Sequence, residues 1–136
     1  MLKNFTELRV RYADTDQMKF AYNGKYFEYF EVGRTDMMRE VGLPYEIIEK
    51  NGFFMPVIET KIRFFQPAFY DELLLIETRV EQLPLVKVHI DHIIKAKERN
   101  IVVCEGYVEL AFLDAKTNRP TRAPKLFIDS VKKYYE

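Results

Sequence analysis

The sequence predicts a single α+β domain in which an antiparallel sheet, five-stranded or slightly larger, wraps around a long central helix. A chain of 136 residues with 48% hydrophobic residues can bury one core without disulfides or metals. One long helical pattern is followed by four long strand patterns, and only short breaks separate those strands. Short connections join antiparallel neighbours. Because no repeat or linker interrupts residues 1–136, all elements belong to one domain.

The first expected strand covers residues 5–12, where apolar and polar side chains alternate. From position 23 the period changes, and one helix face carries Tyr26, Phe30, Gly33, Met37 and Val41. Glycine inside a helix costs about 1 kcal/mol relative to alanine, so Gly33 indicates a neighbour that packs closely there. Gly42 is expected to end this helix, and Pro44 to begin a short second one.

Four further strands are expected over residues 55–65, 72–82, 86–96 and 101–113, followed by a closing helix near residues 126–134. The sheet is the large apolar partner that the single apolar face of the long helix requires. The packing of this helix face against the sheet gives the predicted architecture.

Composition excludes several classes of protein. Lys plus Arg and Asp plus Glu each number 21, and this neutral balance argues against non-specific binding of nucleic acid. A neutral surface also does little to resist self-association. No stretch approaches the ~20 apolar residues of a membrane span, and the first residues lack the apolar core of a signal peptide. The single cysteine, Cys104, excludes an internal disulfide and suits a reducing compartment, so we expect a cytoplasmic protein.

Most reactive side chains have a simple structural interpretation. Cys104 follows two valines in an expected strand, which favours a packing role over that of a nucleophile with His89 or His92 as base. The two histidines are three residues apart on one strand, so they point to opposite faces and form a poor metal pair. Glycine-rich phosphate loops are absent. We therefore expect neither a metal nor a cofactor.

Basic residues form two groups, for which a solvated face is the favoured interpretation. The alternative is a local site for a phosphorylated ligand at Arg119, Arg122 and Lys125, close to an expected loop.

Asp14 and Asp16 lie between the first strand and the long helix, and they form the strongest candidate site. A carboxylate there faces backbone N–H groups that have no partner within the helix, and also the positive end of the helix dipole. One interpretation is that one of the two caps a turn. The other is a carboxylate that attacks a substrate carbonyl, or activates water, while a backbone N–H of the helix start binds the oxygen.

The segment from Arg9 to Gly42 resembles the 4-hydroxybenzoyl-CoA thioesterase family of hotdog-fold proteins, and in particular its small bacterial acyl-CoA thioesterases. The resemblance continues from Arg63 to Pro67, where family members enter the next strand, and at residues 118–120 near the end of the sequence, and it covers nearly the whole chain. The matching residues are Tyr12, Thr15, Asp16, Tyr22, Tyr26, Glu31, Gly33, Arg34, Thr35, Arg63, Phe64, Pro67, Asn118, Arg119 and Pro120.

The resemblance implies that Asp16 is the catalytic carboxylate, either as nucleophile or as general base for water. The backbone N–H of Asn23 falls where relatives polarise the thioester carbonyl. Substrate contacts are implied at Tyr22, Gly24, Tyr26, Met55, Val57 and Arg63. The chain departs from the family at Lys19, where glycine is common, and at Lys25, where asparagine is common.

The implied activity is hydrolysis of acyl-CoA thioesters without a cofactor, in a homodimer at least and with a homotetramer expected. Residues 55–61 of the neighbouring chain would line the acyl pocket of a site shared across the dimer. Two alternatives stay open: a thioesterase for acyl carrier protein, and a non-catalytic acyl-binding protein. A dehydratase of the same fold is disfavoured because no histidine lies near the helix start.

Overall fold

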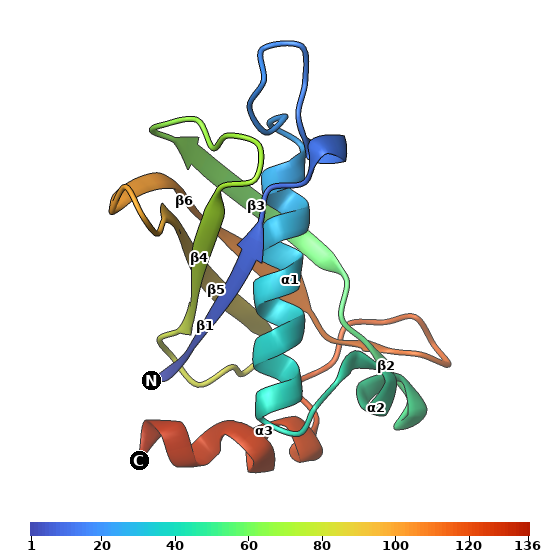
Figure 1. Ribbon diagram of the computed structural model, residues 1–136. Coiled ribbons are helices and arrows are strands. Elements are labelled where there is room, and N and C mark those ends of the chain that lie inside the picture. Colours follow the sequence, from blue (N-terminus) through green and yellow to red (C-terminus); the bar gives the residue numbers. More distant parts are fainter.

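The computed structural model describes residues 1–136 and has a five-stranded antiparallel sheet with one 16-residue helix packed across it (Figure 1). The strands are hydrogen-bonded in the order β1-β4-β5-β6-β3. The elements are α1 (Lys25–Glu40), β1 (Leu2–Arg9), β3 (Val57–Phe64), β4 (Leu73–Val80), β5 (Lys87–Ala96) and β6 (Ile101–Ala111). The predicted α+β hotdog architecture is therefore confirmed.

Shorter elements connect or follow the sheet strands and α1. They are η1 (Tyr12–Asp14), α2 (Tyr45–Lys50), β2 (Phe53–Phe54), β7 (Leu113–Asp114), α3 (Lys125–Val131) and η2 (Lys132–Tyr135). The small strands β2 and β7 pair with each other in a separate two-stranded sheet. No helix of the chain is long and apolar enough to cross a membrane.

Two expected boundaries are wrong for local reasons. The first strand ends at Arg9 rather than continuing to Tyr12, because the next residues turn into η1. The strand expected over residues 101–113 ends at Ala111 as β6, because Leu113 belongs to β7, which pairs with β2 in the separate small sheet. The strand expected over residues 55–65 is β3, from Val57 to Phe64.

The core lies between α1 and the inner face of the sheet. The predicted helix stripe is confirmed for Tyr26, Phe30, Gly33 and Met37, which are all buried. Its last member, Val41, follows the end of α1 and is only partly buried against the core. Strands β4 and β5 supply the opposing apolar layer through every second residue. That layer includes Leu74, Ile76, Val80, Val88, Ile90 and Ile94.

A close contact between α1 and β4 explains the glycine in the helix. A Cβ atom placed on Gly33 would lie 2.5 Å from Thr78 Oγ1 and 2.9 Å from Ile76 Cγ2. The Thr78 hydroxyl is in turn 3.1 Å from Nδ1 of buried His92, whose ring stacks on Phe30. Burial lowers the pKa of His92 to about 3, so this histidine is neutral and part of the core. The expected close neighbour of Gly33 is therefore the sheet itself.

Strand β3 forms one edge of the sheet and is exposed along almost its entire length. Val57 and Ile58 are 50% and 55% exposed, and Phe64 is 46% exposed. An edge strand with unpaired backbone groups and exposed apolar side chains at both ends favours pairing with another strand.

We predict that Gly33→Ala lowers the stability of the protein, although alanine is the better helix former. The added methyl group would force α1 away from β4, and overpacking of this kind costs about 1–3 kcal/mol, which exceeds the gain in helix propensity of about 1 kcal/mol. Denaturant unfolding measures the difference. Val32→Ala, at a 43% exposed position of the same helix, is the control and is expected to change stability little. A Gly33→Ala variant more stable than the wild type would contradict the packing account.

Candidate active site

The segment between β1 and α1 folds into a tight hairpin that carries Asp16. Thr15 and Ala21 pair across its base. The Asp16 N–H donates to the Phe20 carbonyl at 3.1 Å, and the Lys19 N–H donates to the Asp16 carbonyl at 3.0 Å. Such a three-residue loop places its third residue in the left-handed region, where glycine is favoured.

Lys19 occupies that third position with φ of +69°. A side chain costs about 1–2 kcal/mol there, because Cβ approaches the following carbonyl oxygen. This geometry gives a physical reason for the glycine that the resembling family commonly has at this position.

Asp14 is a structural carboxylate. It is buried, and its Oδ2 accepts hydrogen bonds from the Tyr29 hydroxyl at 2.8 Å and from the Arg11 N–H at 3.1 Å. The Arg11 guanidinium donates to Oδ1 at 3.1 Å. Burial alone would raise the pKa of Asp14, but the hydrogen bonds from Arg11 and Tyr29 outweigh it and hold the pKa below its usual value. Asp14 therefore fixes the turn that precedes α1.

Asp16 is half-buried, and its carboxylate accepts fewer hydrogen bonds than that of Asp14. Its Oδ1 accepts one hydrogen bond, from the Met18 N–H at 2.8 Å, and its Oδ2 has no partner in the chain. The side chain lines an open hollow, and one carboxylate oxygen is free to meet a substrate. The other lining residues are Tyr12, Ala13, Thr15, Gln17, Lys19 and Tyr70.

The start of α1 presents unused donors. The N–H groups of Asn23 and Gly24 donate to no acceptor in the chain, whereas the next two N–H groups bond back to Tyr22 and Asn23. A Cβ atom on Gly24 would lie 2.9 Å from the Tyr22 ring, so the glycine lets this ring lie against the helix start. Free N–H groups at a helix N-terminus suit a developing oxyanion.

A second hollow, the aromatic hollow, adjoins the helix start, and half of its lining residues are aromatic. It is lined by Phe20, Ala21, Asn23, Tyr26, Phe64, Phe65, Gln66 and Pro67. A single chain therefore places Asp16 and Asn23 in two neighbouring hollows, with no hydrogen bond between them.

The other expected contact residues lie in different surroundings. Tyr22 is 59% exposed beside the helix start, whereas Tyr26 is buried and its hydroxyl accepts the Ala68 N–H at 3.3 Å. Arg63 is exposed, with its guanidinium 5.8 Å from the centre of the Phe65 ring.

Met55 and Val57 lie at the opposite end of β3 from the aromatic hollow. Met55 packs against the core and Val57 is half exposed. The residues from Val57 to Phe64 extend roughly 23 Å along the strand, at about 3.3 Å per residue. Within one chain, these two residues therefore do not reach the helix start.

Sequence reasoning missed Tyr70 and the ring pair that it forms. Tyr70 lies edge-to-face against Tyr12 at 5.7 Å, and both rings border the hollow of Asp16. The contact depends on a bridge between Phe20 and Phe69, which are far apart in sequence. No local spacing signals such a contact, although Tyr12 was among the residues that carry the family resemblance.

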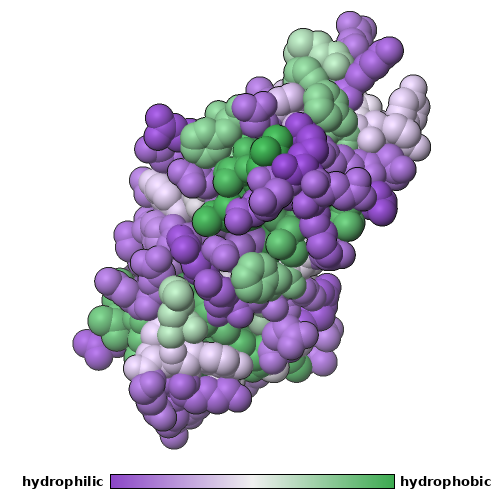
Figure 2. Space-filling view, turned by 60° about the vertical axis from the view of Figure 1, so that its left-hand side comes forward, coloured by the Kyte–Doolittle hydropathy of each residue, from purple (hydrophilic) through white to green (hydrophobic).

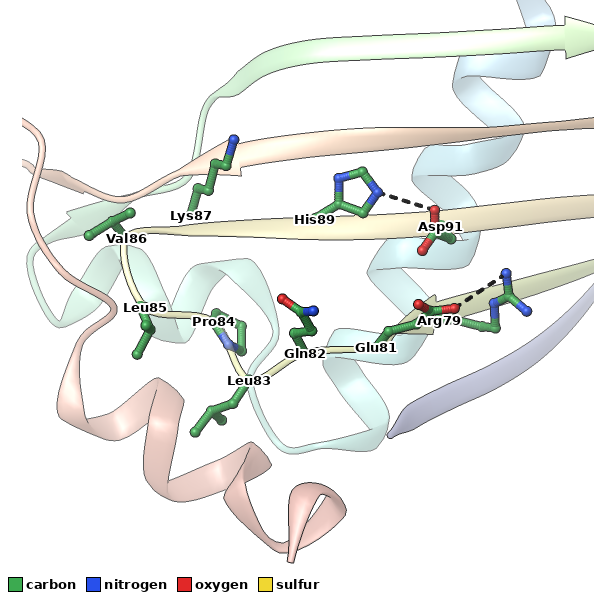
Figure 3. A pocket seen from close by; sticks show the side chains of 10 residues that line it. All are labelled: Arg79, Glu81, Gln82, Leu83, Pro84, Leu85, Val86, Lys87, His89 and Asp91. Atoms are coloured by element: carbon green, nitrogen blue, oxygen red, sulfur yellow. Dashed lines mark hydrogen bonds and ion pairs between the residues drawn. The ribbon is translucent and has the colours of Figure 1, made fainter.

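Another hollow lies on the outer face of the sheet, beside the loop between β4 and β5 (Figure 3). Several of its charged groups form ion pairs: Arg79 is 3.7 Å from Glu81, and His89 lies between Asp91 at 3.2 Å and Glu109 of the neighbouring strand at 2.8 Å. The buried Nε of Arg79 has no hydrogen-bond partner. Partial burial alone would lower the pKa of His89, but contacts with the two carboxylates outweigh it and raise the pKa. Figure 2, which brings the left-hand side of Figure 1 forward, shows a mostly hydrophilic surface with scattered hydrophobic patches.

Cys104 is buried, and burial raises the pKa of its thiol to about 12. The interpretation of this residue as a packing group is therefore confirmed, and the thiol is a poor nucleophile. Asp16 and the free N–H groups at the start of α1 form the arrangement best suited to acyl transfer.

The model of the thioesterase-like superfamily matches residues 10–131, and the chain belongs to this superfamily. The match includes the hairpin of Asp16, α1 and the sheet from β3 to β6. The narrower assignment to the 4-hydroxybenzoyl-CoA thioesterases stays a prediction.

Among curated proteins, the chain is similar to the putative acyl-CoA thioesterase YneP of Bacillus subtilis, with 39% identity over 75 residues that cover 55% of this chain and 54% of that protein. It is 27% identical to the chloroplastic acyl-acyl carrier protein thioesterase ATL2 of Arabidopsis thaliana, over 87% of this chain and 62% of that protein. The match thus spans about half to three-fifths of these two relatives. The acyl-CoA thioester hydrolase YbgC of Escherichia coli is 25% identical over 92% of both chains.

Solved structures share the fold over nearly the full length. The DHNA-CoA thioesterase of Staphylococcus aureus superimposes with a TM-score of 0.89 at 30% identity, covering 99% of this chain and 90% of the other. The hypothetical protein TT1821 of Thermus thermophilus superimposes with a TM-score of 0.87 at 28% identity, covering 95% of this chain and 97% of the other.

We predict that Asp14→Asn destabilises the protein by about 1–3 kcal/mol near neutral pH, because an amide cannot replace every hydrogen bond of the buried carboxylate. Since the pKa of Asp14 is lower in the folded state, its contribution is complete above the ordinary value of 3.8 and is lost as the pH falls through the folded-state pKa. The difference in unfolding free energy between wild type and variant should therefore become smaller at acidic pH. Denaturant unfolding at a series of pH values from neutral to acidic measures this difference.

Asp16→Asn is the matched comparison, because an amide oxygen can still accept the Met18 N–H. Its unfolding free energy should stay within about 0.5 kcal/mol of the wild type. Equal destabilisation by the two substitutions would contradict the division of roles between the carboxylates.

Proposed function

We propose that the protein hydrolyses acyl-CoA thioesters with Asp16 as the catalytic carboxylate. The observation that carries this proposal is the free carboxylate oxygen of Asp16 in the hairpin that leads to the unused N–H groups of Asn23 and Gly24. The names of the relatives YneP and YbgC support the same reaction. The chemistry needs an oxygen nucleophile and a stabilised oxyanion, and a thiolate leaves with little help from an acid.

Two routes use the same atoms. In the nucleophilic route, Asp16 attacks the thioester carbon, the C–S bond breaks, and the electron pair leaves with sulfur as the CoA thiolate. Water then hydrolyses the acyl anhydride and restores the carboxylate. In the general-base route, Asp16 takes a proton from water as the water oxygen attacks the same carbon. The C–S bond of the tetrahedral intermediate then breaks, the electron pair leaves with sulfur as the CoA thiolate, the free acid remains, and Asp16 loses the proton to solvent. In both routes the carbonyl oxygen becomes an oxyanion that accepts the Asn23 N–H.

We further propose that two chains share each site in a homodimer, two of which can form a homotetramer. The exposed edge strand β3, which carries the exposed apolar side chains of Val57, Ile58 and Phe64, supports such pairing. Residues 55–61 of a second copy would then cover the helix start, which explains why Met55 and Val57 lie far from Asn23 within one chain. A covered site also excludes water and strengthens the electrostatic contacts.

Acyl carrier protein is the second candidate carrier of the acyl group, favoured by the similarity to the Arabidopsis enzyme. The formal net charge of zero gives no general attraction for an acidic carrier, so CoA ranks first. A non-catalytic acyl-binding role would require tight binding of acyl-CoA without turnover.

We predict that Asp16→Asn reduces turnover of acyl-CoA esters at least about a hundredfold, because the amide is neither a base nor an oxygen nucleophile. Thiol release from short, medium, long and aryl acyl-CoA esters measures the loss. Asp129→Asn, an exposed aspartate on α3, is the control and should retain full activity. Full activity of Asp16→Asn on every ester that the wild type hydrolyses would refute the assignment.

We also predict that the wild type is a dimer or larger at micromolar concentration, as measured by light scattering. Ile58→Asp places a charge on the exposed edge of β3 and should favour the monomer and lower turnover together. Leu85→Asp, at a 71% exposed position of the loop between β4 and β5, is the control and should stay active. A fully active wild-type monomer would contradict the shared site.

A further inference from the structure

Lys19 places a cation beside Asp16 at a position where the backbone favours glycine. Its left-handed φ of +69° is costly for any residue with a side chain. The Lys19 ammonium nevertheless forms no ion pair or hydrogen bond within the chain, whereas five other lysines pair with carboxylates, namely Lys3, Lys25, Lys87, Lys97 and Lys132. Its side chain is exposed and lines the same hollow as the Asp16 carboxylate. The loop therefore keeps a free positive charge next to the reacting group.

The rest of this hollow is polar or phenolic. Beyond the two charged residues, its lining consists of Tyr12, Ala13, Thr15, Gln17 and Tyr70. An acyl group that extends from the helix start past Asp16 into this hollow would meet hydroxyl, amide and phenol groups, with no aliphatic side chain larger than alanine. An acyl group that carries its own polar substituent would instead find hydrogen-bond donors and a cation.

The proposed chemical step does not need the Lys19 charge. The N–H groups at the start of α1 are available to the oxyanion, and the thiolate leaves without protonation. An acyl carboxylate, however, would be repelled by the negative charge of Asp16, on which hydrolysis depends. A neighbouring ammonium on a flexible stem offsets this repulsion and attracts the acyl carboxylate.

We propose that Lys19 is a specificity-determining residue that selects acyl groups bearing a carboxylate a few carbons from the thioester carbonyl. This inference rests on the proposed thioesterase function and names its substrate class. The Lys19 ammonium binds the acyl carboxylate while Asp16 and the Asn23 N–H act on the thioester carbonyl.

Glutaryl-CoA and hexanoyl-CoA test the proposal, because they have similar lengths and differ in the terminal carboxylate. The wild type should have the higher kcat/KM for glutaryl-CoA. Lys19→Gln should lower kcat/KM for glutaryl-CoA about three- to fivefold, mainly through KM, and change that for hexanoyl-CoA less than about twofold. Lys19→Arg should retain the preference. Lys95→Gln, an exposed lysine on the outer face of β5, is the matched control and should behave as the wild type.

Lys19→Gly separates selectivity from folding. It should raise the unfolding midpoint, because glycine accepts the left-handed backbone, while it abolishes the preference for glutaryl-CoA. An equal effect of Lys19→Gln on both esters, or an unchanged preference, would overturn the role of Lys19. If the wild type hydrolysed neither of these two esters and no other ester of the wider acyl-CoA panel, the proposed function would instead be refuted.

Discussion

The close contact between Gly33 and the sheet is the constraint on which the rest of the structure depends. Because Gly33 has no Cβ atom, the α1 backbone lies directly against Thr78 and Ile76 of β4. Thr78 is tied to His92 of β5, so the helix rests on a hydrogen-bonded pair of neighbouring strands. This contact sets the height of α1 above the sheet. It thereby fixes where the helix start and its free N–H groups emerge at the end of the core.

The two carboxylates between β1 and α1 have different roles, one in the stability of the fold and one in the proposed chemistry. Asp14 is buried and bonded to Arg11 and Tyr29, and it holds the turn that leads to α1. Asp16, two residues later, keeps one oxygen free in an open hollow. A carboxylate that is fully hydrogen-bonded is a weak base and nucleophile, so only the second one is suited to attack a carbonyl. The buried neighbour positions the reactive one without competing with it.

Local patterns predicted the helix stripe, the sheet and the close neighbour of Gly33, because these depend on side-chain periodicity and on backbone crowding. The candidate site was only partly predictable. The spacing of Asp14 and Asp16 left their roles open, since burial and the contact with Tyr29 decide them. The place of Tyr70 in the hollow depends on a long-range bridge. A site shared by two chains cannot be read from the local pattern of one.

The central claim is that Asp16 and the start of α1 act on the same thioester. The most direct measurement is a crystal structure of the dimer with a non-hydrolysable thioether analogue of an acyl-CoA that keeps the carbonyl oxygen. We predict that this oxygen accepts the Asn23 N–H while a carboxylate oxygen of Asp16 faces the carbonyl carbon, with β3 of the partner subunit covering the acyl group. An analogue bound in the outer hollow of the sheet, or with its carbonyl away from both groups, would contradict the account.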